Sequence, residues 1–187
     1  MCLRVLGVGN LTSRWNHWNR PQEWANFGGI FAYNPKTRAE DPELQKSIID
    51  AQESLDVFIR LYKEFKGKIG VFFAIKVPIK DGRDTAHFWY TYRGIDNNKL
   101  IGEHFELPPD LVEYKSIEVA KQEIEDWMII DHGHLYGGYS IRLQRKKLPE
   151  EMKKKFDEYV GVKVYMDNDF WRIRIDCESE ANHNLIL

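Results

Sequence analysis

The stretch DPELQKSIIDAQESLDVFIRLYKEFKG, residues 41–67, decides how the fold of this chain is read. Its apolar side chains recur at alternating spacings of four and three, which places them on one stripe of a helix: Leu44, Ile48, Ala51, Leu55, Phe58, Tyr62 and Phe65. Asp41 can cap the first turn, and Pro42 suits the first helical position, where no amide bond is lost. Gly67 can end the helix in a left-handed conformation. The stretch therefore predicts one long amphipathic helix.

After this helix the apolar pattern changes to period two. Residues 69–79 and 85–95 alternate in this way around Asp81-Gly82, a favoured hairpin turn. The sequence predicts further strands at residues 99–107, 115–120, 127–130, 135–145, 162–165 and 170–176, and a short helix at residues 149–159. Short turns join antiparallel neighbours, because a parallel pair needs a long crossover. We therefore expect an α+β fold, with the long helix packed on a curled antiparallel β-meander or a small β-barrel.

The composition is that of an ordinary globular protein, and 187 residues are enough for a single domain with a substantial core. The net charge of −2 argues against a nucleic-acid partner, because duplex binding usually needs a basic excess. The two cysteines, Cys2 and Cys177, form neither a disulfide framework nor a zinc pattern. We see no signal peptide and no apolar run of bilayer length, so we expect a cytoplasmic protein without a membrane partner.

The single domain is expected to consist of a core with an addition at each end. Residues 41–147 form the expected core. Residues 1–40 form an aromatic-rich N-terminal extension, and residues 148–187 add a helix and a hairpin.

One face of the predicted sheet gathers polar and aromatic side chains. The two-residue hairpin turn would set Lys76 opposite His87 and place Trp89 on the same face. The length of the next turn decides whether Glu103 or His104 joins that face, and the sequence leaves both open.

Two kinds of chemistry could use these residue types. His87 could form an acid–base pair with Glu103 or Asp126, because a carboxylate beside large rings has a raised pKa. His132 and His134 could place two imidazoles on one side of a strand, a spacing that metal sites use. The alternative to an acid–base pair is that His87 and Asp126 are structural and bond backbone groups. The alternative to a metal site is a solvated turn, which the glycine between the two histidines indicates.

Several segments in a fixed order resemble a known family. They are His87-Phe88-Trp89, Ile101-Gly102, Ile124-Glu125-Asp126-Trp127-Met128 and Leu135-Tyr136-Gly137-Gly138-Tyr139-Ser140-Ile141-Arg142. Over residues 44–147 the chain resembles the bacterial domain-of-unknown-function family 2314. Ala86 stands where the family usually has Glu, Ser140 where it usually has Thr, and Glu106-Leu107-Pro108 where it usually has Asn-x-Pro, which puts in question a site relying on that Glu or Asn. The resemblance implies a fold and a bacterial origin, and no activity.

No catalytic triad, dyad or phosphate loop is complete in the sequence. We therefore expect an uncharacterised, non-catalytic module, without a cofactor, that binds a small molecule or a protein. The expected binding residues are Lys76, His87, Trp89, Tyr136 and Tyr139. One alternative is a small hydrolase or metal-dependent enzyme using His87 with Glu103, Asp126 or His132, and another is single-strand binding through the basic run 142–147. A homodimer would be an ordinary assembly for such a protein.

Overall fold

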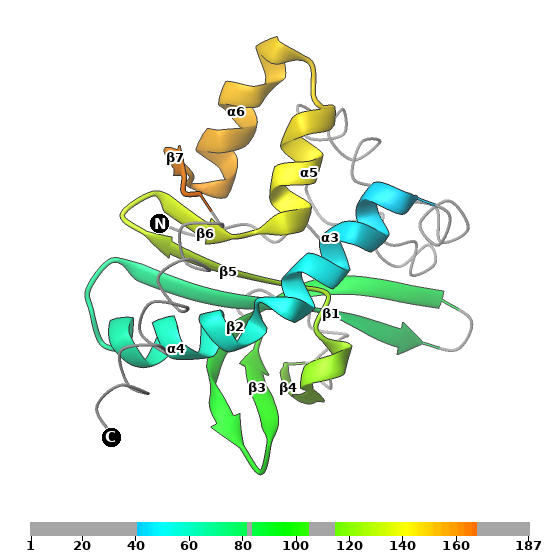
Figure 1. The fold of residues 1–187 in the computed structure, drawn as a ribbon, viewed down its shortest axis with the longest axis vertical. Helices are drawn as coiled ribbons and strands as arrows, with labels where there is room; N and C mark the ends of the chain where they lie inside the picture. The colour runs from blue at the N-terminus through cyan, green and yellow to red at the C-terminus, as the bar shows by residue number, and fades with distance from the viewer. Residues whose placement is uncertain (1–40, 82–83, 105–114, 168–187) are drawn as a thin grey trace, which may run out of the picture.

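The computed structural model describes residues 41–81, 84–104 and 115–167 (Figure 1). The predicted N-terminal extension, residues 1–40, and the predicted strand at residues 170–176 lie outside these ranges. The described elements are, in chain order, α3 (Pro42–Glu53), α4 (Leu55–Phe65), β1 (Val71–Asp81), β2 (Asp84–Asp96), β3 (Lys99–Glu103), β4 (Ser116–Ala120), η3 (Lys121–Glu123), β5 (Asp126–Asp131), β6 (His134–Gly137), α5 (Tyr139–Lys147), α6 (Glu150–Val160) and β7 (Val164–Tyr165).

The predicted long helix is two helices that meet at Ser54. Its start is confirmed, because the Asp41 carboxylate accepts the amide protons of Glu43 and Leu44. The prediction of one unbroken helix is wrong. The indole Nε1 of Trp127 donates to the carbonyl of Ala51 at 3.1 Å, and a side chain inserted into the backbone bonding of a helix breaks it there.

The described strands form one open sheet in the order β4-β3-β2-β1-β5-β6-β7. All neighbours are antiparallel except β6 and β7, which are parallel. The first four strands form a meander, but β5 returns to pair with the free side of β1. The mixed fold with an antiparallel-dominated sheet is confirmed, whereas a complete meander or a closed barrel is not (Figure 1).

The β1–β2 hairpin has a register shifted from the predicted one by two residues. Asp81 pairs with Asp84, so Lys76 lies opposite Trp89 and Pro78 lies opposite His87. A register shift of two residues keeps every side chain on the same face of the sheet. The prediction of which side chains of β1 and β2 share a face is therefore confirmed.

The predicted strand at residues 135–145 is wrong beyond Gly137. Gly137 and Gly138 have φ values of 66° and 64°, the left-handed region, which turns the chain out of β6 and into α5. The alternating pattern alone predicted that the strand would continue through these two glycines. Their left-handed backbone conformation instead ends the strand, and helix α5 follows.

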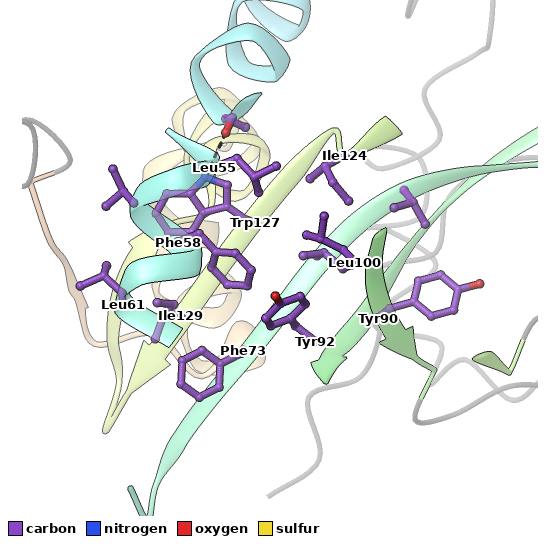
Figure 2. Close-up of a cluster of buried hydrophobic side chains, with 14 of the residues drawn as sticks. Leu55, Phe58, Leu61, Phe73, Tyr90, Tyr92, Leu100, Ile124, Trp127 and Ile129 are labelled. Carbon is purple, nitrogen blue, oxygen red and sulfur yellow. Dashed lines mark hydrogen bonds between the residues drawn. The ribbon is translucent and has the colours of Figure 1, made fainter. Parts of the chain in front are cut away.

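Helices cover both faces of the sheet, with a separate apolar cluster on each. On one face α3 and α4 pack on a cluster rich in rings, where Phe58 lies 4.9 Å from Tyr92 and 5.3 Å from Trp127, between ring centroids (Figure 2). On the other face α5 and α6 cover Trp89 with Phe156 and Val160. In the described part of the chain no helix is long and apolar enough to cross a membrane.

Candidate functional site

The predicted binding residues lie on both faces of the sheet. Lys76, His87 and Trp89 share the face covered by α5 and α6, where each is less than a tenth exposed. Tyr136 pairs with Ile129 and belongs to the cluster on the α4 face. Tyr139 packs against the same cluster, and its hydroxyl lies 2.7 Å from that of Ser54. The five residues therefore do not form one surface.

Asp126 is fully buried and caps helix α5 from a distant point in the sequence. The residue at the start of α5, Gly138, has no side chain with which to cap it. The Asp126 carboxylate accepts instead from the amides of Tyr139 at 3.1 Å, Ser140 at 2.7 Å and Trp127 at 2.8 Å. These bonds satisfy amides that a helix start leaves without partners. Asp126 therefore holds α5 on the sheet and presents no free oxygen to a substrate.

Lys76 compensates the buried charge of Asp126. The two residues face each other across β1 and β5, and the Lys76 Nζ donates to the Ser140 hydroxyl at 3.3 Å. The same ammonium lies 5.9 Å from the centroid of the Trp89 ring. Burial raises the pKa of the Asp126 carboxyl, while the bonds from Ser140 and the charge of Lys76 oppose that rise.

His87 pairs with Glu125, a residue that the sequence did not single out. The His87 Nδ1 lies 2.7 Å from the Glu125 Oε2, with side chains 10% and 14% exposed. The Glu125 amide donates to the carbonyl of Lys76 at 2.8 Å, which fixes Glu125 at the point where β5 begins. Glu125 comes close to His87 of β2 because β5 returns to pair with β1. In the sequence, the pair of acidic residues Glu125-Asp126 was the only signal that could have pointed to Glu125.

Glu103 and His104 take opposite faces, which resolves the alternative that the sequence left open. Glu103 pairs with Thr91, on the face of His87, and its carboxylate is bound by Arg93 at 2.7 Å. His104 lies on the other face, edge-on to the rings of Phe88 at 5.6 Å and Tyr90 at 5.2 Å, between centroids. Burial lowers the pKa of His104 to about 4, so its imidazole is neutral near pH 7.

His132 lies in the turn between β5 and β6, and His134 is the first residue of β6. The imidazole of His132 bonds the neighbouring Asp131 carboxylate at 2.6 Å, and that of His134 lies 3.0 Å from the Asp131 carbonyl oxygen. Within residues 41–81, 84–104 and 115–167, no three His, Cys, Asp or Glu side chains are placed to hold a metal ion. The two histidines stabilise a turn in this arrangement.

Comparison with known proteins places this fold in a family. A family model described as "Uncharacterized protein conserved in bacteria (DUF2314)" matches residues 41–164. The chain belongs to this family. The resemblance read from the sequence motifs is thus confirmed, and the family match extends past them through α6 to β7. The DUF2314 description assigns no activity.

Two curated relatives are similar to this DUF2314 chain over about half of its length. The chain is 34% identical to the uncharacterized protein YegJ of Escherichia coli K12 over 101 residues, which make up 52% of this chain and 64% of YegJ. It is 29% identical over 98 residues to a putative ankyrin repeat protein of Neisseria meningitidis serogroup B, covering 49% of the chain and 39% of that protein. The chain thus spans less than two thirds of either relative. No solved structure matches it.

Proposed function

We propose that this DUF2314 protein is a non-catalytic binding module that contacts a partner around the His87–Glu125 pair. The observation that carries the proposal is the place of this pair at the margin of the fold. Its two side chains keep 10% and 14% of their surface exposed, just where β5 stops pairing with β1. A paired imidazole and carboxylate at such a margin supply both a donor and an acceptor for recognition.

Binding is favoured over catalysis because the other candidate groups do not reach His87. The carboxylate of Asp126 is taken up by backbone amides, and that of Glu103 is bound by Arg93. His132 follows the far end of β5, so about 17 Å of strand separates it from Asp126. These other bonds support binding over a proton transfer between His87 and Glu103, Asp126 or His132.

A protein is the favoured class of partner. The Neisseria meningitidis relative is named a putative ankyrin repeat protein, and this chain covers 39% of it. Ankyrin arrays present extended concave surfaces that bind other proteins. A DUF2314 region joined to such an array supports a role in protein interaction over one in small-molecule binding.

The proposal is tested by affinity capture with the full chain and isosteric variants. We expect a specific partner to bind the wild type, and its affinity to fall at least about tenfold in His87→Gln and in Glu125→Gln, because each variant removes the charge from one member of the pair. Glu103→Gln is the matched control, since it neutralises a carboxylate on the same face without touching the pair. Equal recovery of the partner by the wild type and the two pair variants would contradict the proposal.

The 2.7 Å contact also favours a second candidate, a hydrolase in which Glu125 orients His87 as a general base. This candidate is tested with ester and phosphoester substrates, and with metal analysis of protein purified without a histidine tag. Turnover that disappears in both His87→Gln and Glu125→Gln would replace the binding proposal with the enzymatic one.

A further inference from the structure

The far end of β5 from His87 carries an exposed, cationic tip that the sequence reading missed. We define the basic tip as residues 66–70, the turn at residues 132–134 and residues 163–164. The carbonyl of Gly70 accepts from the amide of His132 at 3.3 Å, and the carbonyl of Gly133 accepts from those of Lys163 and Val164 at 2.7 Å and 3.1 Å. In Figure 1 the α4–β1 connection and the β5–β6 turn lie on the same side of the molecule.

Ile69 projects from the basic tip into solvent. The sequence pattern assigned Ile69 to a strand, but β1 begins at Val71 and leaves Ile69 in the turn, 92% exposed. Gly67 and Gly70, with φ values of 87° and 82°, form the bends on either side of it. Val164, 44% exposed, adds a second apolar side chain to the basic tip. Among the described residues, Ile69 belongs to neither apolar cluster and leaves most of its side chain uncovered.

Two lysines, Lys66 and Lys68, precede Ile69 in the same turn. The ammonium of Lys66 lies 5.7 Å from the Tyr62 ring centroid, and that of Lys68 lies 4.3 Å from the Phe65 ring centroid. These contacts hold the two lysines beside the turn. In the described ranges no carboxylate forms an ion pair with Lys66, Lys68 or Lys163, and the nearby Asp131 is bound by His132. Within the described residues, these three ammonium groups are therefore available for contact with a binding partner.

We propose that the basic tip binds the surface of an anionic phospholipid membrane. Ile69 would enter the headgroup layer, while Lys66, Lys68 and Lys163 contact lipid phosphates. An exposed isoleucine next to lysines complements a flat anionic surface, whereas a protein partner would have to offer a pocket for the isoleucine. Because the whole chain carries a net charge of −2, such binding would depend on local clusters of lysines and not on the charge of the whole molecule.

The proposed membrane contact is independent of the proposed function, and it differs from the expectation of no membrane partner. The tip lies at the opposite end of β5 from the His87–Glu125 pair, so either surface could fail its test without affecting the other. The sequence led us to expect no membrane partner because it has no spanning segment. Contact at the headgroup layer requires none.

The test is co-sedimentation of the full chain with vesicles. We expect binding to vesicles of equal parts phosphatidylglycerol and phosphatidylcholine, no binding to phosphatidylcholine alone, and weaker binding as salt is raised. Each of Lys66→Gln, Lys68→Gln and Lys163→Gln should lower the partition coefficient about fivefold. Ile69→Asp should lower it at least as much.

Matched controls separate the tip from general charge and from folding. The triple change Lys153→Gln, Lys154→Gln and Lys155→Gln on α6 removes three positive charges, as many as the three tip changes together, and Ile49→Asp alters another exposed isoleucine, on α3. Both should leave vesicle binding unchanged, with circular dichroism confirming the fold of every variant. Equal loss in the α6 triple, or a wild type that ignores anionic vesicles, would overturn the proposal. Retention of that wild type on polyglutamate through the same lysines would identify an acidic protein instead.

Discussion

At the scale of single residues, Gly137 shows how one backbone conformation fixes the fold. A Cβ atom there would lie 2.5 Å from the Trp127 ring and from the Trp127 carbonyl oxygen, with φ at +66°. Gly161 has a similar φ of +74° but open space around it. We expect Gly161→Ala to cost about 1 kcal/mol, for left-handed strain alone, and Gly137→Ala to cost about 3 kcal/mol or more, for strain plus a clash. Urea unfolding measures both, and equal costs would mean that the Trp127 contact can relax.

His104 makes stability depend on pH. Burial lowers its folded pKa from 6.5 to about 4, so the unfolded state binds more protons between these two values. The contribution of the neutral imidazole is fully present above pH 6.5 and is lost as pH falls toward about 4. The loss amounts to about 3 kcal/mol for a side chain that is 5% exposed.

The measurement is the free energy of unfolding of the wild type and of His104→Leu, compared at pH about 7.5 and about 4.5. The variant cannot titrate at this position, so its loss of stability on acidification should be smaller than that of the wild type. Parallel losses in the two proteins would show that His104 does not carry the effect.

At the scale of elements, helix α5 depends on a carboxylate from β5. Asp126→Ala would leave the amides of Tyr139 and Ser140 without their acceptor and the ammonium of Lys76 without its counter-charge. We expect a loss of about 3–5 kcal/mol, the cost of breaking a buried charge pair. Thermal unfolding gives the size of the loss.

A double-mutant cycle locates that cost. If Asp126 and Lys76 act as a pair, then Lys76→Met should restore part of the stability that Asp126→Ala removes, because it deletes the buried charge left behind. Additive losses would show that helix capping alone accounts for the role of Asp126.

The elements that the sequence predicted well are those set by local pattern. The α3–α4 stripe is largely buried as its spacing predicts, and the faces of β1 and β2 survive because the register shift is even. The turn at Asn97-Asn98 follows from the tolerance of asparagine for positive φ.

What the sequence could not predict depends on contacts between distant residues. The helix break at Ser54 requires an indole 76 residues away from Ala51. The His87–Glu125 contact requires β5 to return beside β1, and nothing local to either residue encodes that pairing. Periodicity reports which face a side chain takes, but it does not report which strand will lie beside it.

At the scale of the whole molecule, the sheet is stabilised from both faces, and the second face depends on the C-terminal helix. Predicting residues 41–147 as the core leaves α6 as an addition, yet Phe156 and Val160 of α6 are 0% and 2% exposed. They cover Trp89, Met128 and Ile130 of the sheet. Arg145 of α5 also bonds Asp157 of α6 through both carboxylate oxygens, at 2.7 Å and 3.0 Å, which fixes the two helices together.

A chain ending after Lys147 should therefore lose cooperative folding. It would lack four buried side chains of the second cluster, Leu148, Phe156, Val160 and Val162, worth about 6–12 kcal/mol together. That range matches the total stability of an ordinary domain, about 5–15 kcal/mol. Calorimetry and binding of a hydrophobic dye should show no sharp transition and an exposed apolar face. Phe156→Asp in the full chain should have the same effect and Lys154→Ala none, whereas a truncated chain with a wild-type melting transition would show that the sheet is stable without α6.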